Sequence, residues 1–160
     1  MRAIQRAILS LAALCVLVPG APALAKAAAK PGPAARAAVH PISGLPVITL
    51  RVRGHAFRVE LARTDAEQQK GLMFRTAMGA NEGMLFPEKT PRQVAFWMRN
   101  TILPLDIVFI GPDRRILNIV NAIPYDETPL PSAGPASAVL ELNAGRTRAL
   151  GIKVGDKVDW

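Results

Sequence analysis

The strongest constraint on the fold is a series of short apolar runs, rich in β-branched residues and separated by turn residues. The run at 56–62 alternates Phe57, Val59 and Leu61 with Arg58 and Glu60, which is the period of a half-buried strand. The other runs cover residues 47–52, 94–98, 105–110, 116–122 and 138–142. Many short strands with few helices predict a mainly β (β-rich α+β) fold: a small antiparallel barrel or sandwich with one or two short helices.

Local signals predict the connections. Arg53-Gly54-His55 is a turn that joins the first two runs into a hairpin. Thr64 and Glu67 form a capping box that begins a short helix, which ends at Gly71. A second helical turn is expected within residues 145–151 and a closing strand at 157–160, while residues 125–135, with three prolines, are expected to be irregular. The order of runs shows no βαβ alternation, which disfavours a doubly wound sheet.

The N-terminus predicts export. Arg2 and Arg6 precede an apolar run at 7–18, and Ala23-Leu24-Ala25 is a small-x-small site, so residues 1–25 are expected to be a cleavable signal peptide. An uncleaved membrane anchor stays open as the alternative. Residues 26–44 are expected to be a disordered Ala/Pro-rich spacer, and residues 45–160 a single globular domain. The protein is therefore expected in the periplasm or outside the cell, with no membrane span after cleavage.

Composition excludes several classes of function. The only cysteine, Cys15, lies in the predicted signal, so the mature chain has no thiolate and no disulfide. Two histidines are too few for a typical zinc site, and we expect no cofactor. The net charge of +8 falls to +3 in residues 45–160, where 15 basic residues face 12 acidic ones. These charges are scattered, which argues against nucleic-acid binding; we expect a monomer.

A polar cluster lies in a stretch that otherwise has the composition of a protein core. Trp97, Arg99, Asn100 and Thr101 precede the apolar strand that contains Asp106. Donors beside an aromatic face suit a sugar or an anionic small ligand. The alternative is that Asn100 and Thr101 only shape a turn. The predicted ligand-binding residues are Arg75, Trp97, Arg99, Asn100, Thr101, Asp106 and Glu141.

Asp106 and Glu141 are also candidates for a catalytic pair. Period two places Asp106 opposite Leu105 and Ile107, and Glu141 opposite Leu140. If their strands meet in one barrel, the two carboxylates can converge on a cleft and do acid/base work, as in glycoside hydrolysis. The alternative is that each caps a loop or pairs with an arginine, Arg75 or Arg99.

Three methionines offer a third site. Met73, Met84 and Met98 each lie beside another apolar residue. Thioethers bind Cu(I), although methionine in such surroundings more often fills gaps in a core. A metal site built from these three residues is therefore the alternative to having no metal.

Five segments together resemble one family. They are Gln69–Arg75, Glu82–Phe86, Phe96–Thr101, Pro104–Phe109 and Val139–Gly145, in this order along the chain. They are similar to the signature blocks of the domain-of-unknown-function 192 family, and the resemblance spans roughly Phe57 to Val158. It implies a compact β-rich domain, often behind a signal peptide or a membrane anchor, and it implies no activity.

The function expected from these observations is that of an exported, non-enzymatic module that binds a small ligand or a cell-envelope partner through the Trp/Arg/Asn/Asp cluster. The alternatives are a carbohydrate-active hydrolase or lyase that uses Asp106 and Glu141, and a methionine-based Cu(I) binder. A pure interaction surface also fits. Serine-triad hydrolysis does not, because His55 is the one histidine of the predicted domain and lies in a turn.

Overall fold

The computed structural model describes residues 38–160. The predicted signal peptide and the first part of the predicted spacer, residues 26–37, lie outside the described residues. The elements in chain order are β1 (Val47–Val52), β2 (His55–Leu61), α1 (Asp65–Lys70), β3 (Glu82–Arg92), β4 (Ala95–Phe96), β5 (Leu105–Ile110), β6 (Ile116–Ala122), β7 (Leu130–Pro131), β8 (Ala136–Asn143), α2 (Arg146–Ala149) and β9 (Val158–Asp159).

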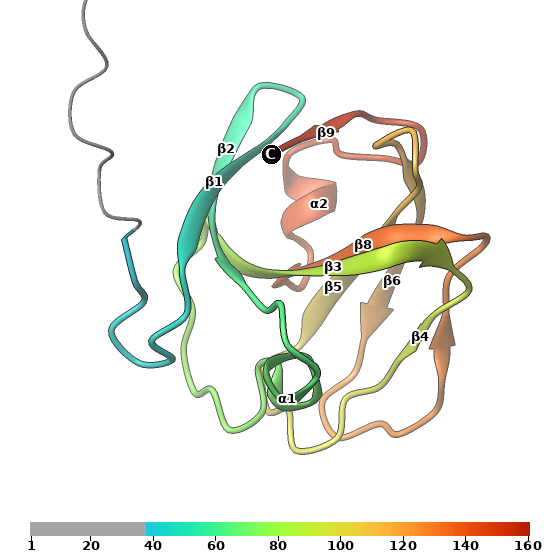
Figure 1. Ribbon diagram of the computed structural model, residues 1–160. Coiled ribbons are helices and arrows are strands. Elements are labelled where there is room, and N and C mark those ends of the chain that lie inside the picture. Colours follow the sequence, from blue (N-terminus) through green and yellow to red (C-terminus); the bar gives the residue numbers. More distant parts are fainter. Residues whose placement is uncertain (1–37) are drawn as a thin grey trace, which may run out of the picture. The chain divides into compact units, whose positions relative to one another are not determined.

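Seven strands form one strongly curled sheet in the order β6-β5-β8-β3-β2-β1-β9, and β4 pairs with β7 in a separate ribbon (Figure 1). The two ends of the large sheet approach each other, because the backbone N–H of Val158 donates to the carbonyl of Arg114 at 2.8 Å and that of Ile116 donates to the carbonyl of Asp156 at 3.0 Å. The predicted mainly β fold with two short helices is confirmed; the sheet curls into a half-barrel.

The predicted hairpin turn and helix caps are found in the structure. In the β1–β2 turn, Arg53 and Gly54 have φ of 50° and 82°, the positive values that a tight hairpin requires. Thr64 and Glu67 make both hydrogen bonds of the predicted capping box, and Gly71 ends α1 with φ of 45°. None of the helices within residues 38–160 has the length and apolar character needed to cross a bilayer.

Two expectations are corrected. The chain does contain one βαβ unit, since β2 and β3 flank α1 and pair in parallel. Strand β3 was not predicted, because Gly83 and Pro87 interrupt it and residues 83–86 are all buried, so no alternation is visible. The fold also begins before Leu45: the backbone N–H of Val47 donates to the carbonyl of Ala38 at 2.6 Å, and Val39 bridges to Pro46.

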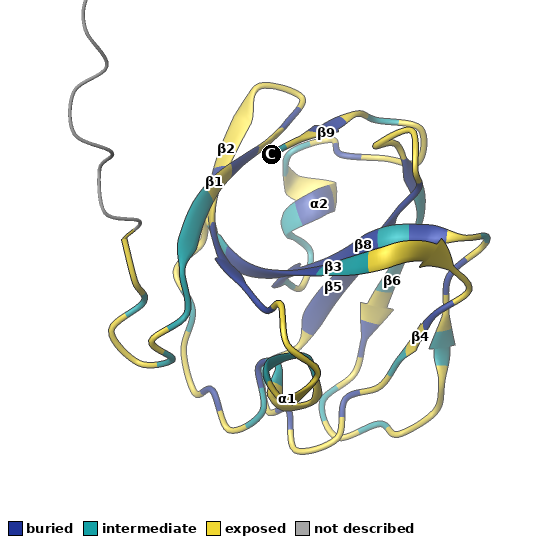
Figure 2. Cartoon of the chain, viewed as in Figure 1, coloured by how far each residue is buried: buried dark blue, intermediate teal, exposed yellow. Residues whose placement is uncertain are grey.

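The sheet is buried on both faces, which produces two hydrophobic clusters (Figure 2). The first cluster contains Val108 of β5 and Leu140 of β8, on the face toward α2. The second contains Ile107 and Phe109 of β5 and Val139 of β8. Alternate residues of a strand point to opposite faces, so each central strand supplies both clusters. The second cluster lies beneath α1 and β4, and this is where the candidate site forms.

Candidate functional site

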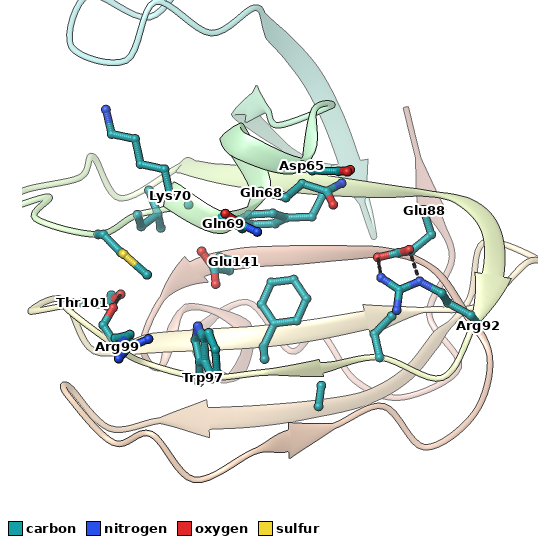
Figure 3. Close-up of a pocket in the computed structure, with 17 residues that line it drawn as sticks. Asp65, Gln68, Gln69, Lys70, Glu88, Arg92, Trp97, Arg99, Thr101 and Glu141 are labelled. Atoms are coloured by element: carbon teal, nitrogen blue, oxygen red, sulfur yellow. Dashed lines mark hydrogen bonds and ion pairs between the residues drawn. The ribbon is translucent and has the colours of Figure 1, made fainter.

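A cavity of about 440 Å³ lies over the second cluster. Its walls come from α1 and the turn after it, from the second half of β3, and from β4 and the loop that follows (Figure 3). Strand β8 contributes one residue, Glu141, from beneath. A volume of this size is in the range of pockets that hold small organic molecules.

Glu141 is a buried carboxylic acid without a partner. In the sheet it lies between Met84 of β3 and Ile107 of β5, both of which are buried apolar residues. Only 5% of Glu141 is exposed, and no residue within 38–160 donates a hydrogen bond to its side chain or forms an ion pair with it. Burial disfavours the charged form and raises its pKa to about 8. At neutral pH this acid is mainly protonated, so it both donates and accepts.

Aromatic rings form the wall opposite α1. Phe96 of β4 contacts Phe86 edge to face, with ring centroids 5.1 Å apart, and packs in the same way on Phe109 at 6.1 Å. Trp97 follows Phe96 and lies at the mouth, with 51% of its surface exposed. In Figure 3 Glu141 lies between the side chains of α1 and those of Trp97 and Arg99. The cavity therefore combines an apolar wall with one buried acid.

The loop after β4 places a cation beside Trp97. The guanidinium carbon of Arg99 lies 5.7 Å from the Trp97 ring centroid, and Arg99 Nε lies 3.7 Å from Glu127 Oε1. Asn100 makes the turn, with φ of 52°, and its carbonyl accepts from the backbone N–H of Phe74 at 2.9 Å. Thr101 Oγ1 donates to the carbonyl of Arg99 at 3.1 Å. Of these residues Trp97, Arg99 and Thr101 line the cavity, whereas Asn100 shapes the loop.

Helix α1 supplies polar side chains that the sequence pattern does not indicate as site residues. Gln68 Nε2 donates to the carbonyls of Ala62 and Pro87, at 3.3 and 2.9 Å, and so ties α1 to the strands. Gln69 and Lys70 also line the cavity. Both residues belong to the first segment that resembles the family, Gln69–Arg75, so the sequence does mark them. The short helix does not show from its sequence which of its faces turns toward the cavity.

Asp106 does not reach the cavity. It is fully buried on the opposite face of the sheet, because Ile107, not Asp106, is the residue of β5 that faces Glu141. Its carboxylate accepts from the backbone N–H groups of Gly145 and Thr147, at 2.8 and 2.9 Å, and from Thr147 Oγ1 at 2.6 Å and Asn121 Nδ2. The predicted convergence of Asp106 and Glu141 on one cleft is therefore wrong, and Asp106 holds the loop that begins α2.

Arg75 also lies outside this cavity. It is 8% exposed, and its guanidinium contacts both carboxylate oxygens of Glu60, at 2.9 and 3.0 Å. His40 Nδ1 lies 3.5 Å from the same carboxylate. This buried pair connects β2 to the turn after α1. Arg75 therefore supports the fold and does not take part in the cavity.

The three methionines are not gathered on one cavity wall. Met84 and Met98 are buried in the second cluster and do not line the cavity, whereas Met73 does. Asn100 Nδ2 lies 3.9 Å from Met73 Sδ. Within residues 38–160 no group of three or more histidine, cysteine, aspartate or glutamate side chains is placed to hold a metal ion.

Comparisons with known proteins agree with this fold. The family model DUF192, described as "Uncharacterized ACR", matches residues 48–160. A crystal structure of a protein of unknown function from Novosphingobium aromaticivorans is 61% identical, with a TM-score of 0.76, over 79% of this chain and 94% of that one. A protein from Sinorhizobium meliloti, provisionally described as a transcription regulator, is 41% identical, with a TM-score of 0.68, over 69% and 91%. No protein of curated function matches at a significant level.

Proposed function

This chain belongs to the DUF192 family of uncharacterised domains, and we propose that its cavity binds a small polar organic molecule that Glu141 contacts from beneath. The observation that carries the proposal is the isolation of Glu141. Its carboxyl group has no hydrogen bond or ion pair within residues 38–160, and Glu141 is the one residue of β8 that lines the cavity. A ligand in the cavity can therefore supply the hydrogen-bond partner or opposite charge that the protein does not, and a charge-assisted hydrogen bond of this kind is worth about 1.5–3 kcal/mol.

The surroundings of Glu141 support binding of an organic molecule. Phe96 and Trp97 offer apolar surface on one side, and Gln69 of α1 offers an amide on the other, while the Phe86 ring packs against Gly71 at the end of α1 (Figure 3). Ligand sites commonly pair a mostly apolar wall with a few fixed polar groups. The polar cluster predicted at Trp97–Thr101 contributes to this site, while Asp106 and Arg75 support the fold elsewhere.

Catalysis by Glu141 alone is the second candidate. Its raised pKa of about 8 is the property of an acid that exchanges a proton near neutral pH. Because Asp106 lies on the other face, a two-carboxylate glycosidase mechanism is not proposed again. A single proton transfer, as in a lyase, remains compatible with the site.

A role in transcription is not proposed for this chain, although a relative from Sinorhizobium meliloti carries that provisional description. The domain has a net charge of only +3, without a clustered basic face in its sequence. The signal-like residues 1–25 instead support a place of action outside the cytoplasm, in the periplasm or beyond. A cell-envelope partner would then meet the same exposed Trp97.

Native mass spectrometry of the full chain, expressed with its own N-terminus and purified gently from an exporting bacterial host, tests this function. We expect one extra mass per chain, lost from Glu141→Gln and from Trp97→Ala. Asp159→Asn and Val154→Ala, both on exposed residues outside the cavity, are the matched controls and should retain it. A clean apo mass for the wild type from more than one host would contradict the proposal. Conversion of the released compound by wild type, but not by Glu141→Gln, would favour catalysis.

A further inference from the structure

The charges around the cavity are ordered by depth. The acid, Glu141, is at the bottom of the cavity and 5% exposed, whereas two exposed cations, Lys70 and Arg99, belong to the outer lining. Lys70, the last residue of α1, has no ion pair within residues 38–160, and Arg99 has only the loose contact with Glu127. A ligand that extends from the bottom to the mouth meets an acid first and bases last.

The remaining charged groups that face the cavity change this order little. Glu88 and Arg92 of β3 neutralise each other, and Arg92 Nε lies 2.6 Å from Glu88 Oε2. Figure 3 marks this pair with dashed lines at one end of the cavity. Asp65 lies at the first turn of α1 and is exposed to solvent. Neither the pair nor Asp65 forms a hydrogen bond or an ion pair with Glu141.

The aromatic wall is compatible with a cation. The ring of Trp97 already has the Arg99 guanidinium within 6 Å of its centroid, which is the geometry of a cation–π contact. Phe86 and Phe96 continue the wall inward, and Leu72 and Val94 add aliphatic surface. The cavity thus has room for an apolar substituent as well as for a charged group beside the acid.

We propose that the ligand is a small zwitterion with an apolar substituent, of the class of free amino acids, whose ammonium group contacts Glu141 and whose carboxylate contacts Arg99. This inference rests on the proposed binding function and names its ligand class. The apolar substituent lies against Phe86 and Phe96.

Binding of this kind releases a proton at neutral pH. Empty Glu141 is mainly protonated at pH 7. An incoming ammonium group, already charged, forms an ion pair with the carboxylate, and the proton of Glu141 goes to solvent. The affinity should therefore rise about tenfold per pH unit up to about pH 8, and should fall once the ammonium group itself loses its proton.

Isothermal titration calorimetry of the full chain with four probe compounds tests the inferred ligand class. L-phenylalanine carries both charges, 2-phenylethylamine only the cation, 3-phenylpropanoate only the anion, and methyl glucoside neither. We expect L-phenylalanine to bind best and 2-phenylethylamine to bind with release of a proton, seen as a heat that depends on the ionisation enthalpy of the buffer. We expect 3-phenylpropanoate to bind more weakly than the amine.

Two variants separate the two ends of the ligand. Glu141→Gln should lower the affinity for L-phenylalanine and for 2-phenylethylamine by about 10- to 100-fold and abolish proton release, since charge-assisted hydrogen bonds are worth about 1.5–3 kcal/mol. Arg99→Gln should lower the affinity for L-phenylalanine but not for 2-phenylethylamine. Arg148→Gln, on an exposed residue of α2 away from the cavity, is the matched control.

The outcomes distinguish the inference from the proposed function. Binding of 3-phenylpropanoate or methyl glucoside in preference to the amine would contradict the zwitterionic ligand class. It would leave the proposed function, binding of a small molecule, intact. A co-purified ligand without an amine, found by native mass spectrometry, would do the same. If no probe binds and the native mass is also clean, both proposals fail.

Discussion

Asp106 and Glu141 lie on neighbouring strands within one residue of the same register, yet their side chains leave the sheet on opposite faces. Glu141 faces Ile107 across the β5–β8 pair, and Asp106 faces Leu142. Asp106 therefore enters the first cluster, where it accepts four hydrogen bonds, and Glu141 enters the cavity over the second cluster without any. Two carboxylates of similar sequence context thus have different roles.

Glu141 should make the stability depend on pH. Its pKa rises from an ordinary 4.5 to about 8 on folding, so the unfolded chain loses this proton at lower pH than the folded one. The contribution of this group to the free energy of unfolding should therefore be greatest below about pH 4.5, and should fall by about 1.4 kcal/mol per pH unit up to about pH 8. Urea unfolding of wild type and Glu141→Gln at pH 5, 6.5 and 8 measures this. Glu141→Gln should show a smaller fall; equal pH dependence in both would contradict the burial of an unpaired acid.

Asp106→Asn should destabilise the fold by about 2–4 kcal/mol, because an amide places N–H groups against the donors of Gly145 and Thr147. Chemical denaturation of the variant beside Asp159→Asn, an exposed carboxylate, is the comparison. If Asp106→Asn were as stable as wild type, Asp106 would not be a structural residue and a functional role would regain support.

The Arg75–Glu60 pair should behave as a buried ion pair. Arg75→Met leaves Glu60, which is 3% exposed, without its partner and should cost about 3–5 kcal/mol. The double variant Glu60→Leu/Arg75→Met should cost clearly less than the single one, since no charge is then left buried. Thermal unfolding of both variants tests this; a double variant that is no more stable than Arg75→Met would contradict the expectation.

Gly83→Ala should disrupt the sheet next to the cavity. A Cβ at Gly83 would overlap the carbonyl oxygen of Glu141 and lie 2.9 Å from Leu142 Cδ2. Backbone in the way cannot rotate aside, so we expect a loss of about 1–3 kcal/mol and weaker binding of any ligand that contacts Glu141. Gly134→Ala, where the added Cβ meets open space, is the control and should be neutral. Equal melting temperatures for the two variants would contradict the close approach of β3 and β8.

Local patterns made much of this structure predictable. The alternation in 56–62, the capping box at Thr64 and Glu67, and the Arg53-Gly54 turn each depend on residues close in sequence, and each is found in the structure. The face alternation of Leu105, Asp106 and Ile107 was also correct. Strand β3 was missed because residues 83–86 are buried on both faces and show no alternation, while Gly83 and Pro87 argue against a strand.

What the sequence determined by itself is therefore the mainly β class, most strand positions, the caps and turns, and the family. The tertiary structure alone decided which carboxylate faces the cavity, because that depends on the register between β5 and β8, whose paired residues are far apart in the chain. It also decided that Glu141 has no partner. That result arises because β3, β5 and β8 surround the acid with apolar side chains while α1 and the loop after β4 leave a space above it.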